Sequence, residues 1–366
     1  MIFETLHTSG HEQVVFCNNS AAGLKAVIAI HSTVLGPALG GVRMRPYATG
    51  EDALTDALRL SRTMTYKNAL AGLNVGGGKA VLIGDASRDK TEAMFRAFGR
   101  YVDSLGGRYI TAEDVGTDVN DMEQVYRETE YVVGVHQVHG GSGDPAPFTA
   151  YGALQGLMAT LNRKFGNEEV GRYSYAVQGL GHIGMEFVKL LKERGAKLFV
   201  ADLNKELVRR AVEEYGAEAV RPEEIYDVPA DVFSPCALEG AINGDTLPRL
   251  KAKVICGTAN NQMSHATGVD AAKRGILYAP DYAVNAGGVM NVSLEIDGYN
   301  RERAMRLMRT IYHTVSSVFD LAEKESIAPQ YAADRMAEAR IAAIGKLKLP
   351  LGRTAPRFMG HLRGEH

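Results

Sequence analysis

The sequence predicts an α/β protein of two domains with a cleft between them, and three observations support this. A chain of 366 residues is too long for one simple core. From about residue 145 onward, β-rich runs alternate with helical patterns, as in a doubly wound parallel sheet. The 40 glycines exceed the roughly 7% of average usage and cluster between these runs, so they serve specific backbone sites.

The first 140 residues alternate between strand and helix signals. The expected elements are a strand over 26–34, a helix over 51–64, a strand that begins at Lys79, a helix over about 90–105 and a short strand over 108–111. Because Gly76-Gly77-Gly78 precedes Lys79, we expect this lysine at a loop-to-strand junction. The short strand delivers Asp114 to a strand end, where ligands bind in α/β sheets.

The second half repeats the alternation more regularly. A helix from Thr149 to about Asn162 precedes a strand, glycine turn, helix and second strand within about 30 residues, which is a βαβ unit. Further strands are indicated over 230–237, 252–259 and 276–284, and a helix over 301–324. We expect residues 141–324 to form the second domain, and residues 1–140 with about 325–366 to form the first.

Composition excludes several classes of protein. With 41 Lys+Arg against 43 Asp+Glu and no long run of one sign, the chain shows no nucleic-acid or membrane surface, so its partners are small molecules or copies of itself. Cys17, Cys236 and Cys256 lack metal-ligand spacing, which predicts no metal and fits a reducing cytoplasm. No signal peptide or run of about 18 apolar residues is present, so we expect a soluble cytoplasmic protein.

The turn Gly179-Leu180-Gly181-His182-Ile183-Gly184 follows a β-rich run and opens a helix. This G-x-G-x-x-G pattern aims the helix N–H groups at a pyrophosphate. Asp202 lies about 20 residues further on, where a carboxylate binds ribose hydroxyls and disfavours a 2′-phosphate, so NAD is favoured over NADP. The neighbouring Lys205 could contact a phosphate, and a tight turn without a nucleotide is the alternative. The second domain is therefore predicted to be a Rossmann-like dinucleotide-binding domain.

Lys67 and Lys79 bracket a segment that is nearly devoid of charge. An apolar pocket holding both would let each ammonium lower the pKa of the other, so that one could bind a carboxylate and the other act as a base. Gly77 and Gly78 would let a substrate approach the backbone, and their N–H groups could bind its carboxylate. Asp114 could then handle a proton or an amino group. Each lysine could also be an ordinary surface residue.

Several motifs together carry a resemblance that spans roughly residues 40 to 340. They are GPALGGVRM (36–44), DALRLSRTMTYKNALAGLNVGGGKAVLIGD (56–85), RYITAEDVGTD (108–118), GLGHIG (179–184), DVFSPCALEGAIN (231–243), TANNQ (258–262), ILYAPDYAVNAGGV (276–289) and GYNRERAM (298–305). In order and spacing they are similar to the Glu/Leu/Phe/Val dehydrogenase family, and most to its members that act on leucine. The resemblance implies reversible NAD-dependent oxidative deamination of an L-amino acid to its 2-oxo acid and ammonia.

The resemblance also implies roles for individual residues. Lys67 would hold the substrate carboxylate with help from Asn261, Lys79 would activate the water that attacks an imine, and Asp114 would relay protons to and from the amino group. Thr149 and Asn260 would lie near the nicotinamide. The first domain would also carry the oligomer contacts, in a homo-oligomer that is commonly an octamer.

The same resemblance points to a side-chain pocket formed by Leu39, Gly40, Ala112 and the segment Val289–Leu294. Such a pocket would be apolar and suit branched aliphatic side chains, although ordinary core packing would give the same residues. GGSGD and KAVLIGD also resemble phenylalanine dehydrogenases, and VSLEIDGYN departs from the leucine pattern, whereas AEDVG and the small Ala112 favour leucine. The alternatives are a phenylalanine or valine dehydrogenase, or an inactive nucleotide-binding regulatory protein that keeps the fold.

Overall fold

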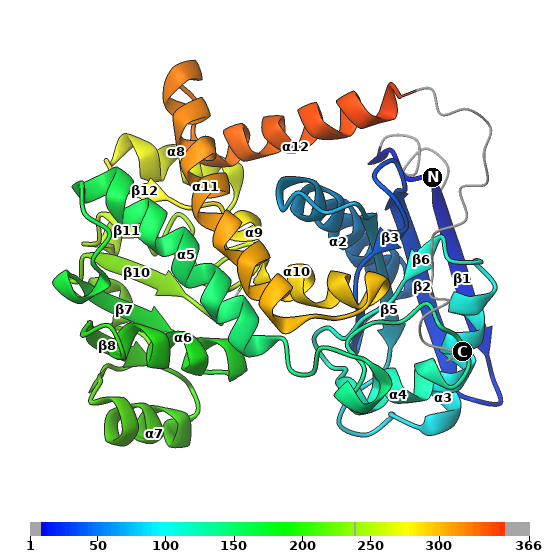
Figure 1. Ribbon diagram of the computed structural model, residues 1–366. Helices are drawn as coiled ribbons and strands as arrows, with labels where there is room; N and C mark the ends of the chain where they lie inside the picture. Colours follow the sequence, from blue (N-terminus) through cyan, green and yellow to red (C-terminus); the bar gives the residue numbers. More distant parts are fainter. Residues whose placement is uncertain (1–8, 238, 348–366) are drawn as a thin grey trace. The chain divides into compact units, whose positions relative to one another are not determined.

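The computed structural model describes residues 9–237 and 239–347 and divides the chain into two compact units (Figure 1). Unit 1 contains the residues up to Asp144, the segment Val289–Arg301 and the residues from Ala337 onward. Unit 2 contains Pro145–Gly288 and Glu302–Met336. Within the described residues, no helix has the length and apolar character needed to cross a membrane.

This division differs from the predicted one at the segments Val289–Arg301 and 325–336. Glu295 ties the first segment to unit 1, because its buried carboxylate accepts the N–H groups of Gly134 and Ser142 at 2.9 and 2.8 Å. Gln330 ties the second segment to unit 2, because its side-chain amide donates to the carbonyl of His265 at 2.9 Å. All three bonds join residues far apart in sequence, which local sequence patterns do not reveal.

The sheet of unit 1 is mixed, with strand order β1-β2-β5-β3-β6 and β4 also paired with β5. Its strands are β1 (Gln13–Asn19), β2 (Leu24–Ser32), β3 (Ala38–Leu39), β4 (Val42–Arg45), β5 (Gly76–Ile83) and β6 (Tyr109–Ile110). The pairs β1–β2 and β2–β5 are antiparallel, whereas β3 and β4 run parallel to β5. Strand β5 is therefore the centre of this sheet.

Strand β5 begins at Gly76, so the expectation of a loop-to-strand junction at Lys79 is wrong. Gly77 and Gly78 already pair with β2, and Gly76 and Gly77 pair with β3. Glycine has low strand propensity. Here the partner strands on both sides hold it in the sheet, which is a tertiary effect.

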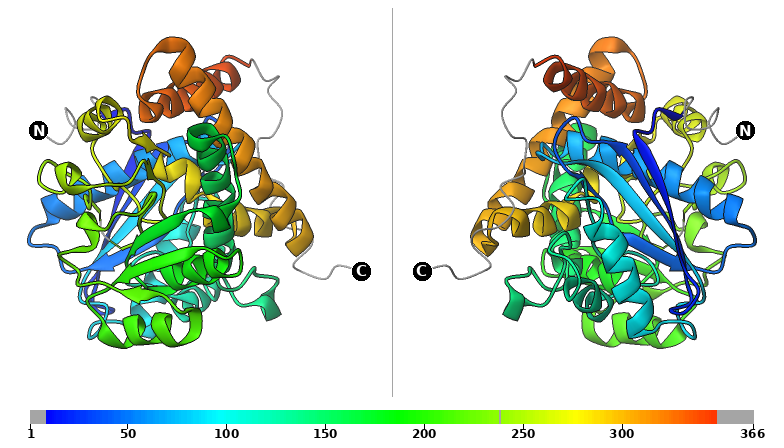
Figure 2. Two further views of the ribbon diagram at one scale, coloured as in Figure 1. Left: turned by 90° about the vertical axis from the view of Figure 1, so that its left-hand side faces the viewer. Right: turned by 90° about the vertical axis from the view of Figure 1, so that its right-hand side faces the viewer.

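Helices cover both faces of this sheet (Figures 1 and 2). They are α2 (Gly50–Leu70), α3 (Glu92–Asp103) and α4 (Val119–Tyr126). Alternate residues of β2 point to opposite faces. Ala26, Ile28 and Ile30 therefore pack in the cluster with the α3 and α4 side chains, whereas Val27 and Ala29 pack with α2.

Helix α2 begins with a capping box. The Thr49 hydroxyl accepts the N–H of Asp52 at 3.1 Å, and the Asp52 carboxylate accepts the N–H of Thr49 at 3.0 Å. The helix continues to Leu70, beyond the predicted end at residue 64. Its last turn is held by Arg340 of unit 1, which donates to the carbonyl of Ala69 at 3.0 Å. Such contacts satisfy carbonyl groups that a helix end leaves without partners.

The sheet of unit 2 is parallel throughout, with order β12-β11-β10-β7-β8-β9. Its strands are β7 (Ser174–Gln178), β8 (Lys197–Ala201), β9 (Glu218–Ala219), β10 (Val232–Pro235), β11 (Val254–Ile255) and β12 (Leu277–Tyr278). The chain starts in the middle at β7, builds outward to β9, and then returns to β10 on the other side. This confirms the predicted doubly wound sheet and places its topological switch point between β7 and β10.

The remaining helices include the crossovers of unit 2 and the C-terminal elements. They are α5 (Ala146–Phe165), α6 (His182–Lys192), α7 (Lys205–Tyr215), α8 (His265–Lys273), α9 (Asp281–Val284), α10 (Gly287–Ser293), α11 (Arg301–Glu325) and α12 (Pro329–Gly345). The helix predicted over 301–324 is confirmed almost to the residue, since its alternating apolar and charged side chains give a clear helical period.

Two histidines pack against helix α2 in unit 1. The His31 ring hydrogen-bonds to the Thr65 hydroxyl at 2.8 Å, and the His11 ring hydrogen-bonds to the Ser61 hydroxyl at 2.8 Å. The two rings are 4.8 Å apart, edge to face. Burial, with smaller effects from His11 and Arg62, lowers the pKa of His31 to about 4. The folded protein therefore disfavours a charge on His31 that the unfolded chain accepts more readily.

We predict that His31 makes the protein acid-sensitive. Because its pKa is lowered from 6.5 to about 4, the unfolded state binds the extra proton between these values, so stability falls as pH falls through this window. The loss is at most about 3 kcal/mol, since one pKa unit corresponds to about 1.4 kcal/mol. In denaturant titrations from pH 7 to pH 4, His31→Gln should flatten this decline, whereas the exposed control His313→Gln should not. Equal slopes in all three proteins would contradict the prediction.

Candidate active site

Strand β5 directs Lys79 into the face of the sheet that α2 covers. Ala80 and Leu82 pack in the cluster on the α3 side, and Val81 packs with α2. Lys79 is two residues before Val81 in the same strand, so its side chain points to the same face and lies toward α2. Its side chain is buried, with 4% of the residue exposed. The alternative that Lys79 is an ordinary surface lysine is therefore wrong.

The Lys79 ammonium shares one carboxylate oxygen with a second cation. Lys79 Nζ lies 3.1 Å from Asp114 Oδ2, and Arg43 Nε donates to the same oxygen at 2.8 Å. The backbone of Asp114 is fixed as well, because its N–H donates to the Thr117 hydroxyl, which itself donates to the carbonyl of Val42. Strand β4, strand β5 and the loop after β6 thus meet at a single carboxylate.

Burial and neighbouring charges shift both ionisable groups. Burial lowers the pKa of Lys79, and the Arg43 guanidinium lowers it further, while the Asp114 carboxylate acts in the opposite direction. Burial would raise the pKa of Asp114, but Lys79 and Arg43 outweigh it and bring that pKa to about 2. At neutral pH, Asp114 is therefore a carboxylate, and Lys79 loses its proton more easily than an exposed lysine.

Arg43 is a cation beside Lys79 that the sequence did not suggest. Its guanidinium lowers the pKa of Lys79, and a mutual effect of Lys67 and Lys79 on their pKa values stays a prediction. Arg43 lies inside the quoted GPALGGVRM motif, with 8% of the residue exposed. The available signal was an arginine between two apolar residues, Val42 and Met44, because arginine in an apolar segment needs a charged partner if it is buried.

Lys67 lies in the last turn of α2 and is half-buried. The next residue, Asn68, is fully buried and donates its side-chain N–H groups to the carbonyls of Gly76 and Leu39, at 2.6 and 3.2 Å. These bonds fasten the last turn of the helix to β5 and β3. The backbone that carries Lys67 is thereby fixed beside the glycine run that leads to Lys79.

The glycines of the predicted site are required by packing. A Cβ at Gly77 would lie 2.1 Å from the nitrogen of Thr65, and one at Gly40 would lie 1.8 Å from the oxygen of Gly78. A Cβ at Gly78 would lie 2.7 Å from the Tyr109 ring. The prediction from the sequence was that Gly77 and Gly78 allow a substrate to approach the backbone, and the resemblance placed Gly40 in the side-chain pocket. The structure supplies a different reason, and contact between Gly40, Gly77 or Gly78 and a substrate stays a prediction.

Three of the predicted pocket residues lie on neighbouring segments. Gly40 donates its N–H to the carbonyl of Ile110 at 3.2 Å, and Val42 donates to the carbonyl of Ala112 at 2.8 Å. Leu39 and Ala112 are buried. The end of β3 and the residues after β6 are therefore side by side. Val289 lies in α10, within the segment that unit 1 draws from the second half of the chain.

Glu113, next to Asp114, is the second carboxyl at this edge. Burial, and then the charges of Asp144 and Asp118, raise the pKa of Glu113 to about 7. Two adjacent carboxyl groups thus differ strongly in their affinity for a proton. Such divergent pairs mark functional sites, although structural networks also produce them.

In unit 2, the glycine turn has the geometry that a dinucleotide needs. Gly179 has φ +99°, so it makes the tight turn after β7. A Cβ at Gly181 would meet no heavy atom within 4 Å, whereas one at Gly184 would lie 2.2 Å from the oxygen of Gly179. Gly181 therefore leaves room for a ligand, and Gly184 allows close packing of helix and strand. Helix α6 begins at His182 without a side-chain cap, so its first N–H groups suit a pyrophosphate.

Asp202 stands at the end of β8 and is bonded to this turn. Its Oδ2 accepts the N–H of Leu180 at 2.7 Å, and its Oδ1 accepts the N–H of Asn204 at 2.7 Å. Each carboxylate oxygen retains a further acceptor position. Lys205, the first residue of α7, is exposed. The residues present therefore fit an adenine ribose beside the turn.

Three more predicted residues belong to unit 2. Thr149 is in the first turn of α5, where its hydroxyl donates to the carbonyl of Pro145 at 2.9 Å and lies beside Gly288. Asn260 accepts from the side-chain amide of Asn285 at 2.8 Å. Asn261 has φ +50°, a conformation that is rare outside glycine and concentrates at functional sites. Asn260 and Asn261 follow strand β11, at the carboxyl edge of the sheet.

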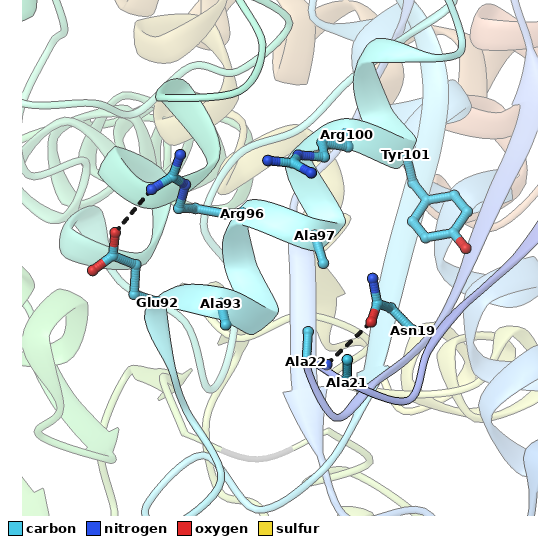
Figure 3. Close-up of a pocket in the computed structure, with 9 residues that line it drawn as sticks. All are labelled: Asn19, Ala21, Ala22, Glu92, Ala93, Arg96, Ala97, Arg100 and Tyr101. Atoms are coloured by element: carbon cyan, nitrogen blue, oxygen red, sulfur yellow. Dashed lines mark hydrogen bonds and ion pairs between the residues drawn. The ribbon is translucent and has the colours of Figure 1, made fainter.

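Two other features of the described chain lie apart from these residues. Across residues 9–237 and 239–347, no group of three His, Cys, Asp or Glu side chains could hold a metal ion. A hollow of about 750 Å³ in unit 1 is lined by the turn after β1 and by α3, including Arg96 and Arg100 (Figure 3). Arg96 pairs with Glu92 and Glu128, and Arg100 pairs with Glu128, so two carboxylates offset the two guanidinium charges.

Family models match both halves of the chain. The model described as Glu/Leu/Phe/Val dehydrogenase, dimerisation domain, matches residues 11–131. The model described as Glutamate/Leucine/Phenylalanine/Valine dehydrogenase matches residues 199–348.

Similar proteins cover nearly the full length. Leucine dehydrogenase of Geobacillus stearothermophilus is 54% identical over 95% of each chain. Phenylalanine dehydrogenase of Bacillus thermotolerans is 47% identical over 94% of this chain and 91% of its own. The crystal structure of L-tryptophan dehydrogenase from Nostoc punctiforme has a TM-score of 0.81 and 42% identity, and the match covers 94% of this chain and 100% of that one.

Proposed function

The chain belongs to the Glu/Leu/Phe/Val dehydrogenase family, and we propose that it catalyses the reversible NAD-dependent oxidative deamination of L-leucine and other branched-chain L-amino acids. The products are the 2-oxo acid, ammonia and NADH. The observation that carries the chemistry is the buried Lys79, whose pKa is lowered beside the Asp114 carboxylate that it shares with Arg43. The similarity to leucine dehydrogenases over 95% of the chain supports the substrate.

In this proposal, Lys79 is the general base. Once the substrate ammonium has lost a proton, hydride loss from its Cα to NAD would leave a protonated imine, and the glycine turn with Asp202 would hold the nucleotide for this step. Water then adds to the imine carbon and gives its proton to the neutral amine of Lys79, and the adduct releases ammonia to form the 2-oxo acid. Such a base must be uncharged at the working pH, and burial together with Arg43 favours that state.

Asp114 would exchange a proton with the substrate amino group. With a pKa of about 2 it is a poor proton acceptor while both cations are present. When Lys79 is neutral, one of these cations is lost and the pKa of Asp114 rises, because a nearby positive charge no longer stabilises the carboxylate. The two groups are therefore coupled, and the neutral lysine that activates water also prepares Asp114 for its proton.

The remaining assignments concern binding. Lys67 and Asn261 would hold the substrate carboxylate, and Thr149 and Asn260 would lie near the nicotinamide. The side chain of the substrate would meet an apolar pocket lined by Leu39, Gly40, Ala112 and Val289, next to the backbone of Gly77 and Gly78. Burial of Leu39 and Ala112 on neighbouring segments supports an apolar pocket at the end of β3.

NAD is the proposed nucleotide. The glycine turn and Asp202 would bind it, and the carboxylate, anchored to the turn through Leu180, would disfavour a 2′-phosphate. Unit 1 would bind substrate and form the oligomer, and unit 2 would bind NAD. The dimerisation-domain match supports a homo-oligomer, for which we propose an octamer. Free cysteines at positions 17, 236 and 256 support a cytoplasmic location.

A substrate panel tests the reaction and its specificity. With NAD present, NADH formation at equal concentrations of L-leucine, L-valine and L-phenylalanine should be fastest with L-leucine and slowest with L-phenylalanine. The similarity to phenylalanine dehydrogenase makes the aromatic substrate the main competitor. A marked preference for L-phenylalanine would replace the proposed substrate. If no amino acid is oxidised, the alternative of an inactive nucleotide-binding protein would be favoured.

Replacing the proposed base tests its role. Lys79→Ala should lower kcat by about 10²–10⁴-fold, the usual contribution of a general base, while NADH binding followed by fluorescence stays unchanged. Lys90→Ala is the matched control, because Lys90 pairs with Asp118 and Asp121 in the same unit. Near-normal kcat in Lys79→Ala would exclude this lysine as the base.

Replacing Asp202 tests the choice of nucleotide. Asp202→Ala should raise the KM for NAD by about 10–100-fold, the effect of losing hydrogen bonds to a charged group, and should raise the activity with NADP relative to NAD. Asp227→Ala, which removes an exposed partner of Arg249 in unit 2, should change neither. An unaltered ratio of the two activities would remove Asp202 from this role.

A further inference from the structure

Arg43 occupies a buried position between two carboxylates in unit 1. Its neighbours in strand β4, Val42 and Met44, pack in the cluster on the α3 side, so Arg43 faces α2 as Lys79 does. Its Nε donates to Asp114 at 2.8 Å, and its Nη1 lies 3.5 Å from Asp56 Oδ2. A planar guanidinium can contact two carboxylates at once, which the single ammonium of a lysine does less well.

Asp56 is the next member of this network. It lies on α2 with 6% of the residue exposed, and it accepts the Tyr47 hydroxyl at 2.7 Å and an N–H of Arg59 at 2.9 Å. The side chain of Arg45, half of which is exposed, lies 3.6 Å away. Charges of alternating sign therefore run from the buried Lys79 through Asp114, Arg43 and Asp56 to the surface arginines.

The charge balance of this network has a consequence for Lys79. The carboxylates of Asp114 and Asp56 are already offset by the guanidinium groups of Arg43 and Arg59. A proton on Lys79 then adds an uncompensated positive charge in a buried place, which low-polarity surroundings disfavour. Without Arg43, the ammonium of Lys79 would be needed to balance Asp114.

We propose that Arg43 is a positioning residue for the reaction. It orients the Asp114 carboxylate and favours the neutral form of Lys79, whereas Asp56 favours the protonated form of Lys79. This inference rests on the proposed function, because it assigns Lys79 as the base. It adds two residues to the proposed mechanism: Arg43 on β4, which contacts Asp114, and Asp56 on α2, which contacts Arg43.

The effects of the neighbouring charges on the pKa of Lys79 have the directions that this arrangement predicts. Arg43 lowers the pKa of Lys79, whereas Asp114 and Asp56 raise it. Glu113 is also close to Asp114, but its own pKa is raised by burial and by the carboxylates Asp144, Asp118, Asp114 and Asp121. Removing Arg43 and removing Asp56 should therefore move the pKa of Lys79 in opposite directions.

The pH dependence of kcat/KM for L-leucine tests this, since its acid limb reports the base in the free enzyme. In Arg43→Gln the limb should move to higher pH by about one unit or more, the size of effect that one nearby charge produces. In Asp56→Asn it should move to lower pH. Arg43→Lys keeps the charge and should hold the limb near its original position, while kcat falls about 10-fold or more because Asp114 is oriented less well.

Arg96→Gln is the matched control. It removes an arginine of the same unit that pairs with Glu92 (Figure 3) and with Glu128 but with no member of this network, and it should leave the acid limb in place. If Arg43→Gln does not fold, Asp56→Asn and Arg43→Lys still test the proposal. A limb that moves in the same direction in Arg43→Gln and Asp56→Asn, or that stays in place in Asp56→Asn, overturns it.

A second measurement separates this proposal from the proposed function. The rate at which acetic anhydride labels Lys79, read by mass spectrometry as a function of pH, reports the pKa of this amine without turnover. Opposite shifts in Asp56→Asn and Arg43→Gln would support the electrostatic role of Arg43 even if no amino acid were oxidised. Unchanged labelling profiles in an enzyme that does oxidise L-leucine would overturn the role of Arg43 and leave the proposed function intact.

Discussion

The site in unit 1 depends on one carboxylate that two buried cations share. Moving a charged group out of water costs several kcal/mol per ion, so the Arg43 guanidinium and the protonated form of Lys79 can be buried only where Asp114 stays charged beside them. Their contacts at 3.1 and 2.8 Å to the same oxygen achieve this, and Asp56 supplies the second negative charge that Arg43 needs. The strong acidity of Asp114 and the weakened basicity of Lys79 are thus two results of one arrangement.

The glycine-rich segments allow this arrangement to be compact. Around β5, the missing Cβ atoms of Gly40, Gly77 and Gly78 let strand β3, helix α2 and Tyr109 approach the central strand closely. Helix α2 can therefore bring Asp56, in its first half, against the face that carries Arg43 and Lys79. In unit 2, the glycine turn uses the same property differently, since Gly181 leaves open space and Gly184 permits contact between helix and strand.

Hydrogen bonds between distant segments decide how the chain is shared between the two units. Glu295 is buried, yet its carboxylate has backbone N–H partners at Gly134 and Ser142, so the segment around it joins unit 1. The segment VSLEIDGYN, which departs from the leucine pattern in sequence, contains this glutamate. A buried carboxylate without such partners would be strongly destabilising, which ties this segment firmly to the loop before Asp144.

The sequence by itself determined the parallel sheet of unit 2, the turn from Gly179 to Gly184, and the identity of Lys79 and Asp114 as candidate reactive groups. Each of these follows from a local pattern, because strand and helix periods and a turn with fixed glycine spacing are properties of neighbouring residues. Only the tertiary structure decided that β5 starts at Gly76, that Arg43 is a cation acting on Lys79, and that residues 289–301 belong to unit 1. The physical reason is that strand pairing, charge balance in a buried space and partners for a buried carboxylate arise between residues distant in the chain.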